Sequence, residues 1–205
     1  MYHYKKGFTL GEILMAVAII SVIAALLIPT LLDKINNADW KIMYKNSFNN
    51  LSKAFEKARI EGKIVDISTY WDTSNNKNNF IAIKDKLIVI NDCSTTLNNS
   101  NCWASGENYF SSPHFTAPAF MDASGQTYAL YCTNSTTCAS TILIDTNGFK
   151  SPNKYGVDRF PLFVVDKDGN NSGEPAQIRP GIDYTSPDAN SCPHGNCFYR
   201  SWIKE

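Results

Sequence analysis

The hydrophobic positions of this chain are concentrated in one block near its N-terminus. Residues 8–32 read FTLGEILMAVAIISVIAALLIPTLL, and Glu12 is the only charged residue among them. A helix needs about 20 apolar residues to cross a bilayer, and this block is long enough. The block therefore predicts a membrane-spanning helix that carries one carboxylate.

A helical period replaces the apolar block over residues 33–62. Apolar or small residues recur there, the last four of them at three- and four-residue spacing, which is one face of a helix, and Gly62 is a stop signal. The positions are Ile35, Ala38, Ile42, Tyr44, Phe48, Leu51, Phe55 and Ala58. Together the two segments predict a continuous helix of about 54 residues, about 80 Å long.

After Gly62 the apolar runs become short, and clusters of Gly, Asn, Pro and Ser separate them. Runs of this kind predict strands, here at residues 81–83, 87–90, 126–131, 141–145, 161–165 and 198–203. The polar stretches 75–79 and 91–101 predict loops. The pattern indicates an α+β fold in which a small antiparallel sheet packs against the amphipathic half of the long N-terminal helix.

Charge composition excludes a global electrostatic attraction to nucleic acid. The chain has 19 basic and 19 acidic residues, which cancel. Outside the N-terminal block it is polar and rich in Asn, Ser and Thr. No nucleic-acid partner is therefore indicated.

The six cysteines form three close pairs, all C-terminal to the apolar block. Local pairing is the simplest of the connectivities that the sequence allows, and zinc sites favour a C-x2-C spacing that does not occur here. Disulfides persist in oxidising compartments, so this part of the chain is expected outside the cytoplasm. The expected pairs are Cys93–Cys102, Cys132–Cys138 and Cys192–Cys197.

The residues that flank the apolar block agree with this orientation. Lys5 and Lys6 precede it, and the positive-inside rule keeps such a basic end in the cytoplasm.

The apolar run is too long for a secretory signal peptide, and no Ala-x-Ala site follows it. A plain anchor leaves Glu12 unexplained, because a carboxylate in a membrane segment costs about 2.5–3.5 kcal/mol and marks a functional partner by default.

The segment Lys6-Gly7-Phe8-Thr9-Leu10-Gly11-Glu12 resembles the prepilin peptidase recognition sequence of type IV pilins and type II secretion pseudopilins. The resemblance implies cleavage between Gly7 and Phe8, N-methylation of the new Phe8 amine, and recognition through Lys6, Thr9 and Leu10. The apolar helix would stay with the mature protein. Residues 1–7 would then be the leader, 8–32 the assembly helix, 33–62 the amphipathic helix and 63–205 the extracytoplasmic head.

The resemblance also implies a partner for Glu12. In a filament its carboxylate would face the Phe8 amine of a neighbouring subunit, and the two charges would attract strongly because water is absent. Pro29 lacks an amide proton and should kink or loosen the helix. In resembling pilins a proline at this distance marks where the helix opens on assembly, and a simple bend at the membrane boundary is an equal alternative.

Residues 144–160 resemble a head segment of many bacterial prepilin-type proteins, and Asp145, Asn147 and Asp158 within it have oxygens that suit calcium. The spacing is not that of an EF-hand, because no Glu stands at the twelfth position. A tight turn with positive φ at Gly148 is the preferred interpretation. Residues 166–170 are expected to form a hairpin turn, and residues 192–197 a disulfide-closed turn rather than a Cys-His-Cys metal cluster.

These observations predict a structural subunit, a minor pilin or pseudopilin, of a type IV pilus or type II secretion pseudopilus. The alternative is a binding module at a filament tip, an adhesin or DNA-uptake minor pilin. No nucleophile elbow, phosphate loop or zinc-protease motif occurs, so no enzyme is expected. The resemblance implies a single-pass protein of the bacterial inner membrane. Its partners would be other subunits, prepilin peptidase, the inner-membrane assembly platform and membrane lipid.

Overall fold

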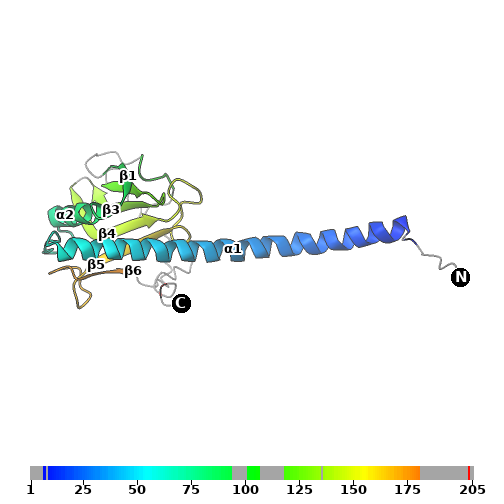
Figure 1. The fold of residues 1–205 in the computed structure, drawn as a ribbon, viewed down its shortest axis with the longest axis horizontal. Helices are drawn as coiled ribbons and strands as arrows, with labels where there is room; N and C mark the ends of the chain where they lie inside the picture. The colour runs from blue at the N-terminus through cyan, green and yellow to red at the C-terminus, as the bar shows by residue number, and fades with distance from the viewer. Residues whose placement is uncertain are drawn as a thin grey trace. The chain divides into compact units, whose positions relative to one another are not determined.

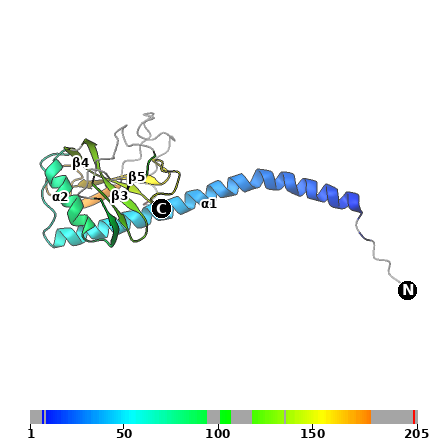
Figure 2. The same ribbon diagram turned by 90° about the horizontal axis from the view of Figure 1, so that it is seen from above.

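The computed structural model of the chain describes residues 7, 9–93, 101–106, 118–134, 136–180 and 203, except the side chains of residues 29–38. The chain divides into two compact units, Met1–Asp39 and Trp40–Glu205. The predicted α+β class is confirmed: one long helix is followed by a second helix and an antiparallel sheet (Figures 1 and 2).

Helix α1 (Leu10–Ile60) is the continuous helix that the two N-terminal patterns predicted. It ends at a Gly62 whose φ is 70°, a left-handed conformation that glycine adopts without a steric penalty. The amide of Gly62 donates to the Arg59 carbonyl at 2.9 Å, and that of Lys63 to the Ala58 carbonyl at 3.0 Å. These two bonds form a Schellman motif, which satisfies carbonyls that the helix end would leave unpaired.

The second half of α1 contributes its apolar face to the core of the head. Tyr44, Leu51, Phe55 and Ala58 are fully buried, and Phe48 is partly buried against them. The helical period predicted one face at Phe48, Leu51, Phe55 and Ala58, and Tyr44 adds to it. Ile42 lies outside this face and is 56% exposed. The reason is geometric, because two residues along a helix correspond to about 200° of rotation from Tyr44.

The described part of the head contains a six-stranded antiparallel sheet in which each strand pairs with the next along the chain. The strands are β1 (Val89–Asp92), β2 (Ala119–Asp122), β3 (Thr127–Asn134), β4 (Thr137–Asp145), β5 (Arg159–Val165) and β6 (Gln177–Pro180). The predicted runs 126–131, 141–145 and 161–165 are confirmed, and 87–90 corresponds to β1 shifted by two residues. The four-residue strands β2 and β6 were not predicted, and residues 198–202 lie outside the described part.

The two faces of the sheet bury two different clusters. Side chains such as Tyr128, Ile142 and Leu162 face α1 and form the main core. Alternate positions point to the other face, where Leu143 packs with Trp103 and Tyr155 from the connecting segments. This alternation is the period of two that a strand imposes, and it brings the loop around residue 103 onto the sheet.

Helix α2 (Thr73–Lys84) corrects two predictions, since residues 75–79 were expected to form a loop and 81–83 a strand. Asp72 caps the helix by accepting from the Asn75 amide at 3.3 Å. The buried Asn79 side chain exchanges two 2.8 Å bonds with the Val65 backbone. Asn is a weak helix former because its side chain competes for backbone groups, so these tertiary bonds override the local preference.

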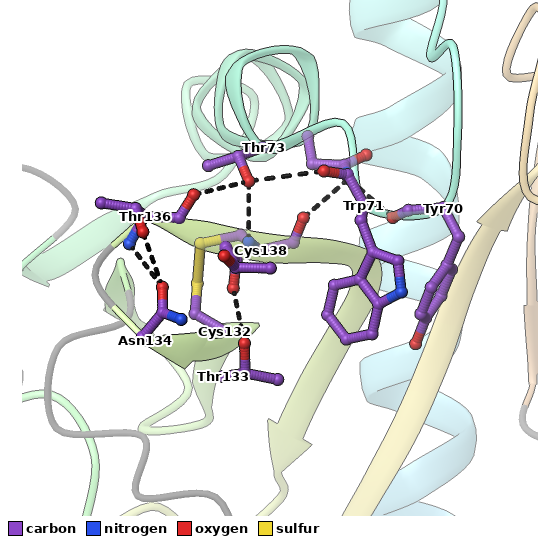
Figure 3. The surroundings of a disulfide bond; sticks show 10 residues. Tyr70, Trp71, Thr73, Cys132, Thr133, Asn134, Thr136 and Cys138 are labelled. Carbon is purple, nitrogen blue, oxygen red and sulfur yellow. Dashed lines mark hydrogen bonds between the residues drawn. A yellow bond between two sulfur atoms is a disulfide. The ribbon is translucent and has the colours of Figure 1, made fainter.

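The disulfides Cys93–Cys102 and Cys132–Cys138 are formed, which confirms local pairing for these cysteines. Cys192 and Cys197 lie outside the described residues. Cys132 and Cys138 stand opposite one another on β3 and β4. Figure 3 shows how the start of α2 is joined to this pair: the Thr73 hydroxyl accepts from the Cys138 amide at 2.9 Å. The disulfide and this hydrogen bond therefore join the β3–β4 hairpin to the start of α2.

Candidate assembly site

The first turn of α1 is closed by three reciprocal hydrogen bonds between Thr9 and Glu12. The amide and the hydroxyl of Thr9 both donate to Glu12 Oε2 at 2.8 Å. The Glu12 amide donates back to Thr9 Oγ1 at 3.3 Å. This is a capping box, which satisfies amide groups that the start of a helix would leave unpaired.

Sequence reasoning missed this arrangement although its signal was present. Thr9-Leu10-Gly11-Glu12 is the S/T-x-x-E pattern before an apolar run, which marks a helix N-terminus. Thr9 and Leu10 had been considered only for peptidase recognition, and Glu12 only for contacts between subunits. The structure brings Thr9 and Glu12 into direct contact.

Behind this turn, the side chains of α1 form an apolar surface that none of the described residues buries. Residues 10–28 are long and apolar enough to cross a membrane, and none of their side chains is buried. The Ser21 hydroxyl is satisfied inside the helix by donating to the Val17 carbonyl at 2.7 Å. A helix that satisfies its own backbone groups and exposes apolar side chains is suited to lipid.

The other predicted residues of this segment are only partly described. Gly7 is exposed, whereas Lys6 and Phe8 lie outside the described residues. Helix α1 continues through position 29, but the Pro29 side chain is outside the description. The choice between helix opening on assembly and a simple bend therefore stays a prediction.

A second charged cluster lies in the head, on the sheet face opposite α1. Asp145 on β4 and Arg159 on β5 are cross-strand partners, and Arg159 Nε donates to Asp145 Oδ2 at 2.8 Å. Their side chains are 0% and 1% exposed. The guanidinium also donates to the Ala104 carbonyl at 2.6 Å and stacks over the Trp103 ring, 4.7 Å from its centre.

Asp158 holds the loop that leads into β5. Its two carboxylate oxygens accept from the amides of Asn153 at 2.8 Å and Lys154 at 2.6 Å. With its amide group in the satisfied orientation, Asn153 Nδ2 donates to Asp145 Oδ2 at 3.0 Å. The loop and the buried ion pair therefore form one hydrogen-bonded network.

Burial shifts the pKa of both carboxyl groups of this network upward. Burial raises the pKa of Asp145 to about 7, since loss of hydration outweighs the attraction of Arg159. Burial raises the pKa of Asp158 as well, against the effect of its backbone donors. Folding thus makes both groups easier to protonate.

The structure places the three calcium candidates in hydrogen-bonded turns. Asp145 Oδ1 accepts from the Asn147 amide at 3.3 Å, and Gly148 has a φ of 67°, as the turn interpretation expected. Among the described residues, no three His, Cys, Asp or Glu side chains form a group that could hold a metal ion. Calcium binding itself stays untested.

The turn predicted at residues 166–170 is confirmed between β5 and β6. Asp166 Oδ1 accepts from the amides of Asp168 at 2.8 Å and Asn170 at 2.7 Å.

The role of Arg159 was missed by sequence reasoning. Its signal was a charge at the start of an apolar strand, in a chain with another charge at the end of the preceding strand.

Comparison with known proteins identifies the N-terminal segment. Residues 2–28 match the family model of the prokaryotic N-terminal methylation motif. No curated protein and no solved structure matches the chain. The matched residues contain the predicted cleavage point, the capping box and most of the apolar span. This motif implies processing by prepilin peptidase and assembly with other pilin subunits. The N-terminal segment therefore carries the signature of type IV pilins and pseudopilins.

Proposed function

We propose that this chain is a structural subunit, a minor pilin or pseudopilin, of a type IV pilus or type II secretion pseudopilus. Prepilin peptidase cuts it between Gly7 and Phe8 and methylates the Phe8 amine. The single observation that carries the proposal is the position of Glu12, a lone carboxylate in the first turn of an uncovered apolar span.

The surroundings of Glu12 support a contact between subunits. Within residues 10–28 it is the only charged side chain, and its recorded hydrogen bonds are those with Thr9. Two neutral donors on one oxygen do not replace the hydration that a carboxylate loses in lipid. A cation brought by another copy would complete the site, and the Phe8 amine of a processed neighbour is such a cation.

The orientation follows from charge and redox chemistry. Lys5 and Lys6 hold the leader in the cytoplasm, and the Cys93–Cys102 and Cys132–Cys138 disulfides suit an oxidising compartment. The protein would therefore lie in the bacterial inner membrane with its head outside the cytoplasm. In that membrane it would meet the assembly platform. A structural role is supported by the described buried charges of the head, since Asp145, Asp158 and Arg159 bond to the head's own side chains and backbone.

The test compares Glu12→Gln with Asp39→Asn in the native host. Both remove one carboxylate from α1, but Asp39 lies beyond the apolar span and is exposed. Mass spectrometry should find mature chains that begin with methylated Phe8 in all strains. Filaments sheared from the cells should contain wild-type and Asp39→Asn chains and be strongly depleted of Glu12→Gln chains.

Two results would overturn the proposal. An intact leader, or a chain that starts well inside the polar region, would exclude processing between Gly7 and Phe8. Normal incorporation of Glu12→Gln chains that are correctly processed and inserted would exclude Glu12 as the assembly contact.

A further inference from the structure

We propose that Thr9 is a positioning residue that holds the Glu12 carboxylate ready for the cation of the next subunit. This inference rests on the proposed function, since it assigns Thr9 a role in the assembly contact of Glu12. It goes further by stating how a single chain in the membrane keeps that carboxylate oriented before a partner arrives.

The geometry divides the two oxygens of the carboxylate. Both Thr9 donors, the amide and the hydroxyl, converge on Oε2 at 2.8 Å. Within the described residues, no hydrogen bond to Oε1 is recorded. The capping box therefore fixes the side chain through one oxygen and leaves the other for a second donor, so a neighbouring cation can bind without displacing Thr9.

The bonds to Thr9 also determine where the charge lies. They draw the carboxylate back toward residue 9, beside the unpaired amides of the first turn, where the helix dipole favours a negative charge. This end of α1 directly follows Phe8 in the chain. In lipid the energetic advantage of such an arrangement is larger than in water, because the dielectric constant is low.

A purely structural role would predict different behaviour. If the hydroxyl only starts the helix, any residue that caps well should replace it. Glycine is nearly as good an N-cap as threonine, but it has no hydroxyl to donate to Glu12. Serine keeps both the cap and the donor, and valine loses both. The three substitutions therefore separate capping from positioning.

The experiment measures incorporation of Thr9→Ser, Thr9→Gly and Thr9→Val chains into filaments of the native host. Each value is divided by the amount of mature, methylated chain in the same membranes, because Thr9 also lies in the peptidase recognition sequence. Ser21→Ala is the matched control, since it removes a hydroxyl from α1 that bonds only within the helix.

Thr9→Ser and Ser21→Ala should incorporate like the wild type. Thr9→Gly and Thr9→Val should each fall about tenfold, the size expected for one hydrogen bond to a charged group. The inference would be overturned if Thr9→Gly chains were incorporated like the wild type. If Thr9→Gly is poorly cleaved, the same test applies to Thr9→Val.

Glu12→Gln in the same assay separates this inference from the proposed function. If Thr9→Gly assembles normally and Glu12→Gln is depleted, only the inference about Thr9 fails. If Glu12→Gln also assembles normally, the proposed function fails as well.

Discussion

Two carboxylates in this molecule, one buried in the head and one in the apolar segment, differ in the partners that their own chain gives them. Asp145 in the head is 0% exposed and bonds directly to Arg159 of the same chain. Glu12 in the apolar segment bonds to Thr9, and residues 10–28 contain no basic residue. The head thus carries its own counter-charge, whereas in the proposed function the apolar segment takes its counter-charge from another subunit.

This difference separates stability from assembly. A buried ion pair that loses one member leaves an uncompensated charge, so changes at Asp145 or Arg159 should unfold the head. In the proposed function, Glu12 contributes to contacts between subunits and little to the stability of its own chain. Changes at Glu12 should therefore leave the fold intact. The following predictions test the comparison from the largest expected effect to the smallest.

Arg159→Met should destabilise the head by about 3–5 kcal/mol, because Asp145 would remain buried without its cation. The matched control is Arg59→Met, which breaks an exposed pair with Glu56 whose side chains are 42% and 44% exposed. That change should cost about 0–1 kcal/mol. Denaturant unfolding of the full chain in detergent measures both. Equal losses for the two variants would contradict the assignment of Arg159 as the counter-charge of the head.

Replacing Cys132 and Cys138 together by serine should lower the free energy of unfolding by about 2 kcal/mol, since the bond closes a short loop. The loss should be confined to the head, because the apolar segment has no cysteine. Membrane insertion and processing of the double variant should match the wild type. A failure to insert or to be cleaved would show that the two units are less independent than the comparison states.

The pH dependence of stability should carry the signature of Asp145. Its pKa rises from 3.8 to about 7 on folding, so the folded head holds more protons than the unfolded chain between these values. The contribution to stability is complete below the unfolded pKa and is lost as the pH rises through the folded one. Asp158 shifts in the same direction.

Thermal denaturation of the full chain should therefore show a melting temperature a few degrees lower at about pH 8 than at about pH 5. Asp145→Asn should flatten this slope, and Glu12→Gln should leave it unchanged. A melting temperature that rises over this range would refute the linkage.

Calcium should have the smallest effect. The oxygens of Asp145 and Asp158 already accept from Arg159 and from backbone amides, as the turn interpretation requires. Adding about 5 mM Ca²⁺ after treatment with a chelator should shift the melting temperature by less than about 1 °C. A shift of several degrees that is abolished by Asp158→Asn would instead establish the calcium site.

The sequence by itself determined the features that depend on neighbouring residues. The apolar span, the stop of α1 at Gly62 and the close cysteine pairs each depend on a short stretch of chain. The structure confirms the first two and the pairs Cys93–Cys102 and Cys132–Cys138. The capping box belongs to this class as well. Thr9 and Glu12 are three residues apart, so their contact was open to prediction although it was overlooked.

Only the tertiary structure decided the features that depend on distant residues. Helix α2 forms from an Asn-rich stretch because Asn79 bonds to the Val65 backbone, 14 residues away. Arg159 becomes the partner of Asp145 only when β4 and β5 align in register. The local period of the sequence determines which face of a helix or strand is apolar. Which buried polar groups pair with one another depends instead on how distant elements pack together in the folded chain.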